Sequence, residues 1–279
     1  MRLAAAPLTD LARWSVLVRD LATGEVLLAH QPDRALPAAS LGKLALLVAV
    51  AARIERGELA PDERLDRASV PPVADSGLWQ HLAQPTLSVA DAAVLVGAAS
   101  DNLATNVLLH RLGEGEGRAA GTGADAVARE CARLGIHGVR LHRPVRDAPD
   151  ASDPTPLSSV SAAGAVDLLA RLDAGTVGTP AVGARALAWL RHSLDLSMVA
   201  SAFGADPLAH GHEEGLRLLN KTGTDAQVRA DAGIVRGARR GLVYAAIAEW
   251  EPGVDARDAV LASMRGLGAA MRALLDAER

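Results

Sequence analysis

Apolar and polar residues alternate in short runs near both ends of the chain, whereas longer segments with helical spacing fill its middle. Residues 14–18 and 25–29 alternate as β-strands do, and residues 19–24 between them contain the Asp, Thr and Gly that favour a turn. We therefore predict a β-hairpin at the N-terminus.

The strand pattern returns in the last quarter of the chain. Turn residues separate three strand-like runs, and an amphipathic helix is predicted over residues 259–277. These runs cover residues 216–222, 230–235 and 242–250. Strands at both ends predict one α/β (α+β) domain over residues 1–279, with a sheet lobe at 1–38 and 209–279 and a helical lobe at 39–208.

Helical periodicity dominates the predicted helical lobe. A buried helix is expected from Ser40 to about Glu55, ending at Gly57, and Ser88 is expected to cap a second helix. Residues 113–123 form a Gly-rich loop without a phosphate-binding spacing. The remaining predicted helices cover residues 89–99, 102–112, 124–134, 159–172 and 182–193.

Composition excludes several classes of function. With 49% apolar residues but only 2% aromatic ones, the core is expected to be aliphatic and base stacking is disfavoured. A net charge of −4 with interspersed signs argues against nucleic-acid partners. The single cysteine, Cys131, excludes an intramolecular disulfide and is predicted to be a core residue. The spacing of His210, His212 and Glu213 matches no common metal site, so no metal or cofactor is predicted.

Nothing in the sequence indicates a membrane segment. No signal peptide is visible, and the longest apolar run, residues 44–52, is far shorter than the ~20 residues of a membrane span. The expected location is cytoplasmic if the chain is complete, and exported if a leader was removed. The oligomeric state is not determined by these features.

The strongest chemical signal is Ser40 followed three residues later by Lys43. Residues three apart share a helix face, so a neutral Lys43 amine would reach the Ser40 hydroxyl and activate it as a nucleophile. Only two of the 29 basic residues are lysines, Lys43 and Lys221. A lysine can be neutralised by burial or by a neighbouring cation, whereas arginine stays charged.

Two further segments complete a candidate site. Ser100 would relay a proton to a leaving group, and Asn102 would bind a substrate amide or hold Lys43. The backbone N–H groups of Ser40 and Thr224 would stabilise an oxyanion. Thr222, Thr224 and Arg229 are candidates to hold a substrate carboxylate, and Gly223 of the Lys221-Thr222-Gly223 strand is a further candidate for substrate binding.

Each segment also has a purely structural interpretation. Ser40 alone fits a helix N-cap, Ser100-Asp101-Asn102 a helix cap, and Lys221-Thr222-Gly223 a strand that enters a turn. Trp79 either packs on a substrate or fills the helical lobe. Their joint occurrence, in order, favours a catalytic site.

The three segments resemble the three motifs of the class A β-lactamase and penicillin-binding-protein superfamily, and the resemblance extends over nearly the whole chain. It implies a five-stranded antiparallel sheet flanked by the terminal helices, an all-helical lobe beside it, and acyl transfer through an ester on Ser40. Within that family pattern Ser40, Lys43, Ser100 and Lys221 are the catalytic positions.

One departure from the family concerns the step that releases the product. Class A β-lactamases carry a Glu in an Ω-loop that activates the deacylating water, but residues 141–156 contain no Glu. Asp147, Asp150 and Asp153 are possible substitutes, although Asp153 matches a structural Asp of the family. Because losing a general base costs about 10²–10⁴ in rate, we expect acylation without efficient penicillin hydrolysis.

The sequence therefore predicts a serine hydrolase of β-lactamase type that acylates Ser40 with a small β-lactam, ester or amide. The alternatives are a covalent binder of β-lactams or peptidoglycan fragments, and a D-alanyl-D-alanine carboxypeptidase with poor deacylation. Glutaminases share the Ser-x-x-Lys arrangement, but the second and third segments fit them less well.

Overall fold

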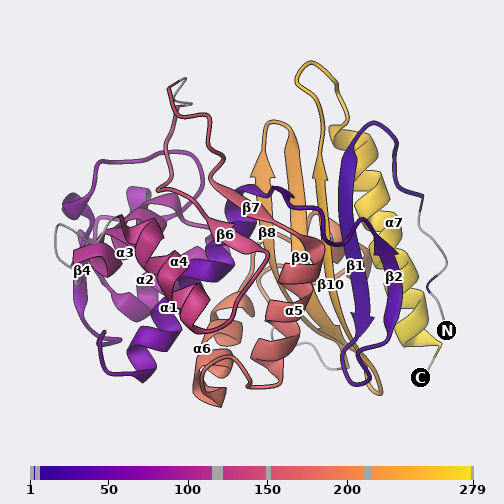
Figure 1. Cartoon of the computed structure of the whole chain (residues 1–279), viewed down its shortest axis with the longest axis horizontal. Helices are drawn as coiled ribbons and strands as arrows, with labels where there is room; N and C mark the ends of the chain where they lie inside the picture. The colour runs from indigo at the N-terminus through magenta and orange to yellow at the C-terminus, as the bar shows by residue number, and fades with distance from the viewer. Residues whose placement is uncertain (1–2, 4–6, 115–121, 149–151, 210–214, 278–279) are drawn as a thin grey trace.

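The computed structural model describes residues 3, 7–114, 122–148, 152–209 and 215–277. Its central feature is a five-stranded antiparallel sheet with the strand order β2-β1-β10-β9-β8 (Figure 1). The predicted sheet and its assembly from both ends of the chain are thereby confirmed. Its strands are β1 (Arg13–Asp20), β2 (Val26–His30), β8 (Arg217–Asp225), β9 (Val228–Arg236) and β10 (Gly241–Glu249).

A carboxylate organises the turn of the N-terminal hairpin. Asp20 Oδ1 accepts hydrogen bonds from the backbone N–H groups of Ala22 and Thr23 at 2.9 and 2.8 Å. Its other oxygen accepts from Arg240 Nε at 2.6 Å. The predicted turn is therefore confirmed, and the same Asp links the hairpin to the loop before β10.

One helix covers each face of the sheet (Figure 1). Because side chains alternate along a strand, Val16 and Val18 of β1 pack in the cluster that contains α7 (Arg257–Asp276). Leu17 between them packs in the cluster that contains α5 (Ala162–Asp173). The second covering helix therefore comes from the middle of the chain, and the described residues before β1 contain no helix.

The other lobe is built around α1 (Lys43–Glu55), which lies among the remaining helices (Figure 1). Eleven of its 13 residues are buried, as expected for a helix that is apolar on all sides. Ser88 caps α2 by accepting from the Asp91 N–H at 3.0 Å, as predicted. The surrounding helices are α2 (Val89–Ala99), α3 (Asn102–Glu114), α4 (Gly123–Arg133) and α6 (Pro180–Leu190).

Short strands were missed by the sequence reasoning because two or three residues do not define a period. They form a three-stranded sheet of order β3-β7-β6 and a two-stranded sheet of β4 and β5. The predicted helix at 159 consequently begins only at Ala162, after β7. These strands are β3 (Leu36–Pro37), β4 (Arg64–Asp66), β5 (Thr86–Ser88), β6 (Val139–Leu141) and β7 (Ser158–Val160).

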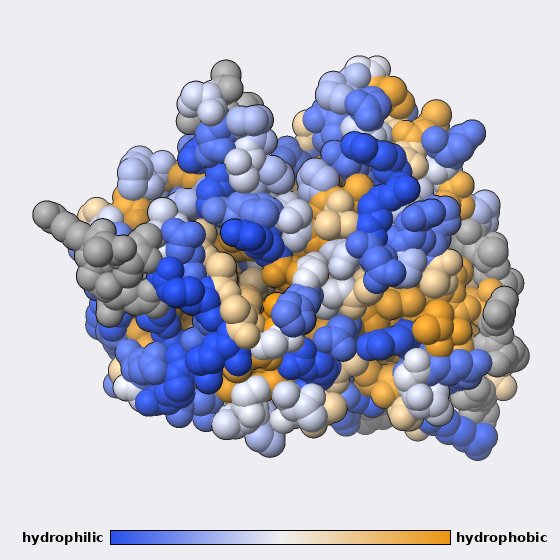
Figure 2. Space-filling model, viewed as in Figure 1, coloured by the Kyte–Doolittle hydropathy of each residue, from blue (hydrophilic) through white to orange (hydrophobic). Residues whose placement is uncertain are grey.

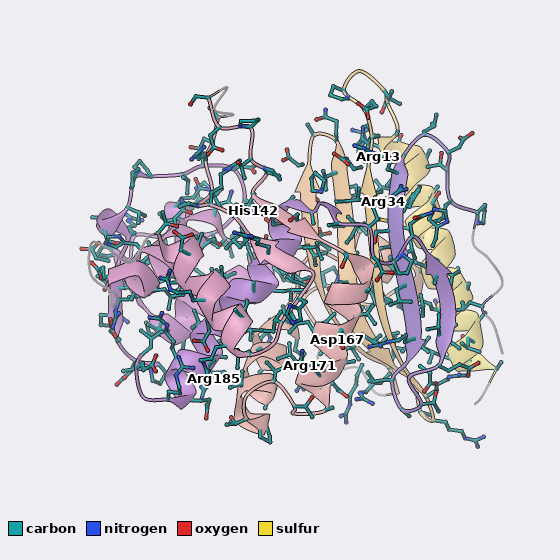
Figure 3. All side chains as sticks on the ribbon, viewed as in Figure 1. Arg13, Arg34, His142, Asp167, Arg171 and Arg185 are labelled. Carbon is teal, nitrogen blue, oxygen red and sulfur yellow. The ribbon has the colours of Figure 1, made fainter. Side chains whose placement is uncertain are left out.

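The two lobes do not divide at the predicted boundaries. The helix α5 packs on β1 and β10, with Asp167 and Arg171 paired on its outer surface (Figure 3). The 3₁₀ turn η4 (Val199–Phe203) packs against α7. Both segments lie within residues 39–208, yet both belong structurally with the sheet.

Cys131 is buried in α4, as predicted, and burial raises the pKa of its thiol to about 12. Within the described part of the chain, no helix is long and apolar enough to cross a membrane. No group of three or more potential metal ligands occurs among these residues either. The His210–Glu214 segment and most of the Gly-rich loop lie outside the described residues.

Candidate active site

A pocket of about 550 Å³ is lined by residues of the helical lobe and of β8, the edge strand of the sheet. Its walls come from the loop before η3 (Trp79–His81), the α2–α3 junction, the segment after α6, and β8. Six of the predicted site residues line it: Ser40, Ser100, Asn102, Lys221, Thr222 and Thr224.

Ser40 lies in a 3₁₀ turn, η1 (Ala39–Gly42), that leads directly into α1. The N-cap positions of η1 and α1 are Ala38 and Gly42, and neither helix end has a side-chain cap. The interpretation of Ser40 as an ordinary N-cap is therefore wrong. Ala39 has a φ of 46°, a left-handed conformation that is unfavourable for a residue with a Cβ.

Lys43 begins α1 and is completely buried. Its Nζ donates to the Ser100 carbonyl at 2.7 Å and to Asn102 Oδ1 at 2.8 Å. Burial, followed by the positive charge of Lys221, lowers the pKa of Lys43 well below its ordinary value of 10.5. In its neutral form the amine would donate its two N–H groups to these acceptors and keep a lone pair with which to accept a proton.

The Ser100 hydroxyl lies between the two lysines. Lys221 Nζ donates to Ser100 Oγ at 2.9 Å, and Lys43 Nζ lies 3.5 Å from the same oxygen. Burial lowers the pKa of Lys221 to about 8, so this lysine is still mostly protonated at neutral pH. The hydroxyl therefore lies between two buried amines, and burial lowers the pKa of both.

Ser100 ends α2 in the left-handed region, with φ 55°. Asp101 then caps α3, because its Oδ1 accepts from the Ala104 N–H at 2.8 Å. Its Oδ2 accepts from the N–H groups of Leu78 and Trp79 at 2.7 and 2.8 Å. The predicted helix cap is thus present, and the same carboxylate also holds the segment at Leu78, which lines the pocket.

Two glycines permit the close packing that brings these segments together. A Cβ at Gly223 would collide with the carbonyl oxygen of Ala38, and a Cβ at Gly42 would collide with Ser158. Glycine at both positions therefore allows β8 and β7 to approach the turn that carries Ser40.

The predicted carboxylate-binding residues divide into two groups. Thr222 and Thr224 line the pocket. Arg229 does not: its guanidinium donates to the carbonyls of Asp225 and Val228 at 2.7 and 2.8 Å and lies 5.7 Å from the Trp250 ring centre. These contacts engage the Arg229 guanidinium outside the pocket, so we do not assign Arg229 to the binding of a substrate carboxylate.

Trp79 is wrongly predicted as a substrate-binding residue. Its side chain has no exposed surface, and its Nε1 donates to the Gln84 carbonyl at 3.0 Å. It belongs to the hydrophobic core of the helical lobe. Of the two interpretations left open by the sequence, the lobe-filling one is confirmed.

The loop over residues 141–156 contributes none of its described residues to the pocket wall. It forms part of a hydrophilic projection above the helical lobe (Figure 2). Asp147 accepts from the Ala74 N–H at 2.8 Å, and Asp153 pairs with Arg146 at 3.0 Å. Asp150 lies outside the described residues. His142, which lies beside β6 (Figure 3), hydrogen-bonds Ser159 at 2.8 Å, and neither residue lines the pocket.

Sequence reasoning missed two carboxylates that line the pocket, Asp75 and Asp195. Neither belongs to a recognisable motif, and each lies in an irregular segment. Asp75 has a φ of 63°, so three of the four described non-glycine residues with positive φ are at or beside the site. Such strain often marks functional positions, but single sequences give no signal for it.

These features define a class of protein: a mixed α/β fold with a serine and two buried lysines at the junction of its lobes. The β-lactamase from Sphaerobacter thermophilus DSM 20745 has 24% identity and a TM-score of 0.76, covering 95% of this chain and 92% of its own. PBP-A has 21% identity and a TM-score of 0.77, with 98% and 93% covered. At such low identity this likeness establishes the fold alone.

A profile of the beta-lactamase enzyme family matches residues 7–267, and the chain belongs to this family. An ancestral class A β-lactamase is also similar, with 22% identity, a TM-score of 0.75 and 95% coverage of both chains. No curated protein sequence matches the chain. Family membership makes this protein a β-lactamase-type hydrolase of small molecules.

Proposed function

We propose that this protein is a serine hydrolase that forms an acyl-enzyme on Ser40. The observation that supports the proposal most directly is the convergence of Ser40, Ser100 and Lys221 on one pocket, with Lys43 buried behind them. These groups come from four separate elements, and the Lys43 and Lys221 amines both approach Ser100. A purely structural role would not require two lysines in the apolar interior.

Acylation would begin with proton transfer from the Ser40 hydroxyl to the neutral Lys43 amine. The Ser40 oxygen then bonds to the substrate carbonyl carbon, and the oxyanion is stabilised by the N–H groups of Ser40 and Thr224. As the bond to the leaving group breaks, Ser100 gives its proton to that group and is reprotonated from Lys43. The charge of Lys221 favours this transfer.

Deacylation would require a water molecule and a base to activate it. The described residues of the 141–156 loop supply no carboxylate to the pocket, which supports slow release of the acyl group. A base at this step typically contributes about 10²–10⁴ in rate. Substrates that suit this arrangement are reactive small esters, amides and β-lactams.

Because the described residues of the 141–156 loop supply no carboxylate to the pocket, a second candidate is also favoured. It is a covalent binder that is acylated once and turns over very slowly. A related structure, a single-residue mutant of PBP-A, is an acyl-enzyme complex with penicillin G. Penicillin is therefore a suitable first probe for this chain.

The test is intact-protein mass spectrometry over time with a penicillin, a cephalosporin and a p-nitrophenyl ester. A transient adduct with accumulating product supports the hydrolase, and a permanent stoichiometric adduct supports the binder. Ser40→Ala is expected to abolish the adduct with every probe. An adduct that persists in Ser40→Ala would contradict the assignment of the nucleophile. Ser159→Ala, outside the pocket, is the matched control and should label like the unmodified protein.

A further inference from the structure

Asp75 and Asp195 reach the candidate active-site pocket from two different segments. Asp75 precedes η3, and its side chain is exposed. Asp195 follows α6 and is only partly exposed; its Oδ1 already accepts from the N–H and hydroxyl of Ser197 at 3.1 and 2.6 Å. Asp75 is therefore the pocket carboxylate that is more available to a ligand.

The backbone around Asp75 is held on both sides. The Asn102 N–H donates to the Ser76 carbonyl at 2.9 Å, and Asn102 Nδ2 donates to the Ala74 carbonyl at 3.4 Å. Gln80 Nε2 donates to the carbonyl of Asp75 itself at 3.0 Å. The same Asn102 that contacts Lys43 thus fixes the position of Asp75 relative to the site.

The Asp75 carboxylate has no ion-pair partner among the described residues. Arg229 lies over Trp250 instead of lining the pocket. The lysine that lines the pocket, Lys221, is directed to Ser100 and to the Thr222 carbonyl at 2.9 Å each. A carboxylate without an ion-pair partner among the described residues therefore remains on the wall of a pocket that is large enough for a small molecule.

We propose that the pocket accepts a substrate whose acyl part carries a cationic amine, with Asp75 binding the amine while Ser40 attacks the carbonyl. This inference rests on the proposed function and adds the class of substrate. Two acidic side chains on the wall make the pocket attractive to cations before contact and disfavour an anionic acyl group.

Bound amine would also affect the base. Burial and then the charge of Lys221 lower the pKa of Lys43, whereas the charges of Asp101 and Asp75 raise it. A cation that neutralises Asp75 removes one of these two opposing charges, so the pKa of Lys43 falls further. A cationic substrate would therefore favour the neutral amine that accepts the Ser40 proton.

The test uses two p-nitrophenyl esters of nearly equal shape, those of 4-(trimethylammonio)butanoate and of neutral 5,5-dimethylhexanoate. The measured quantity is the second-order rate constant for release of p-nitrophenol at low ionic strength. We expect the unmodified protein to prefer the cationic ester by about two- to fivefold, the range of a partly exposed ion pair. Salt at ~1 M should remove most of this preference.

Asp75→Asn is expected to lose the preference, so that its rate constants for the cationic and the neutral ester become equal. Asparagine tolerates positive φ, so this substitution preserves the backbone at residue 75. Asp195→Asn is the matched control and should keep the preference. Equal rates for both esters in the unmodified protein, or loss of the preference in Asp195→Asn alone, would overturn the inference. Failure of both esters to acylate Ser40 would overturn the proposed function as well.

Discussion

The candidate active site and the loop of residues 141–156 differ in how their charged groups are held. In the site, Lys43 and Lys221 are 0% and 2% exposed, and both approach the Ser100 hydroxyl. In the loop of residues 141–156, Arg146 and Asp153 are 37% and 36% exposed and bond to each other. The charged groups of the site are therefore buried, whereas those of the loop are solvated.

This difference has a chemical consequence. Burial disfavours the charged form of a lysine and so provides a base at neutral pH, whereas water screens exposed charges and leaves them with little influence. The candidate active site therefore has the groups needed to form an ester on Ser40. The described residues of the solvated loop include no comparable group with which to hydrolyse it.

The largest expected effect comes from Lys43→Arg, which replaces the proposed base by a side chain that cannot be deprotonated. Acylation should slow by at least about 10²-fold, measured as the rate of adduct formation by mass spectrometry. In the unmodified protein that rate should rise with pH as Lys43 loses its proton. Arg171→Lys on the outer surface of α5 is the control and should change nothing (Figure 3). Acylation at the normal rate in Lys43→Arg would exclude Lys43 as the base.

A second substitution would supply the missing carboxylate. Asn106 lies one turn after Asn102 on α3 and holds Val145 from both sides, donating to its carbonyl at 3.0 Å and accepting from its N–H at 2.8 Å. Val145→Glu should therefore place a carboxylate near the site and shorten the lifetime of the acyl-enzyme by about tenfold or more. Val145→Gln keeps the size without the charge. Equal lifetimes for the Glu and Gln variants would contradict this placement.

The smallest effect on the acylation rate is expected from Asp231→Asn. This substitution instead tests how the buried residues next to Lys221 are stabilised. Asp231 is fully buried and accepts from Asn220 Nδ2 at 3.0 Å and from the Tyr244 hydroxyl at 3.1 Å. Asn220 directly precedes Lys221. Burial raises the pKa of Asp231 from its ordinary 3.8 to about 7.

The sign of the resulting pH dependence follows from proton binding. Between about pH 4 and pH 7 the folded state keeps a proton on Asp231 that the unfolded state has lost, so this group's stabilising contribution declines as the pH rises. Its slope is at most about 1.4 kcal/mol per pH unit. Asp231→Asn should lack that contribution in urea unfolding, whereas Tyr244→Phe keeps the carboxyl and should retain it. If the free energy of unfolding changed with pH in the same way in the unmodified protein and in both variants, the buried, proton-binding state of Asp231 would be contradicted.

Much of the fold could be predicted, because in a long segment the spacing of apolar residues indicates whether it forms a helix or a strand. The five main strands and the helices α1 to α4 follow from the spacing of apolar residues, and Ser88 is a cap by its chemistry. The short strands β3 to β7 could not be predicted, because segments of two or three residues have no period. The start of α5 was displaced for the same reason.

The sequence alone determined which groups form the candidate site. The chain is rich in arginine and has only two lysines. Lys43, three residues after Ser40, and Lys221, in the Lys221-Thr222-Gly223 segment, were recognisable without coordinates. Only the tertiary structure decided their environment. It placed Asp75 on the pocket wall, turned Arg229 onto Trp250 and buried Trp79, since these outcomes depend on contacts between residues far apart in the chain. Local sequence carries the identity of a reactive group, but its pKa and its partners are set by the elements that pack around it.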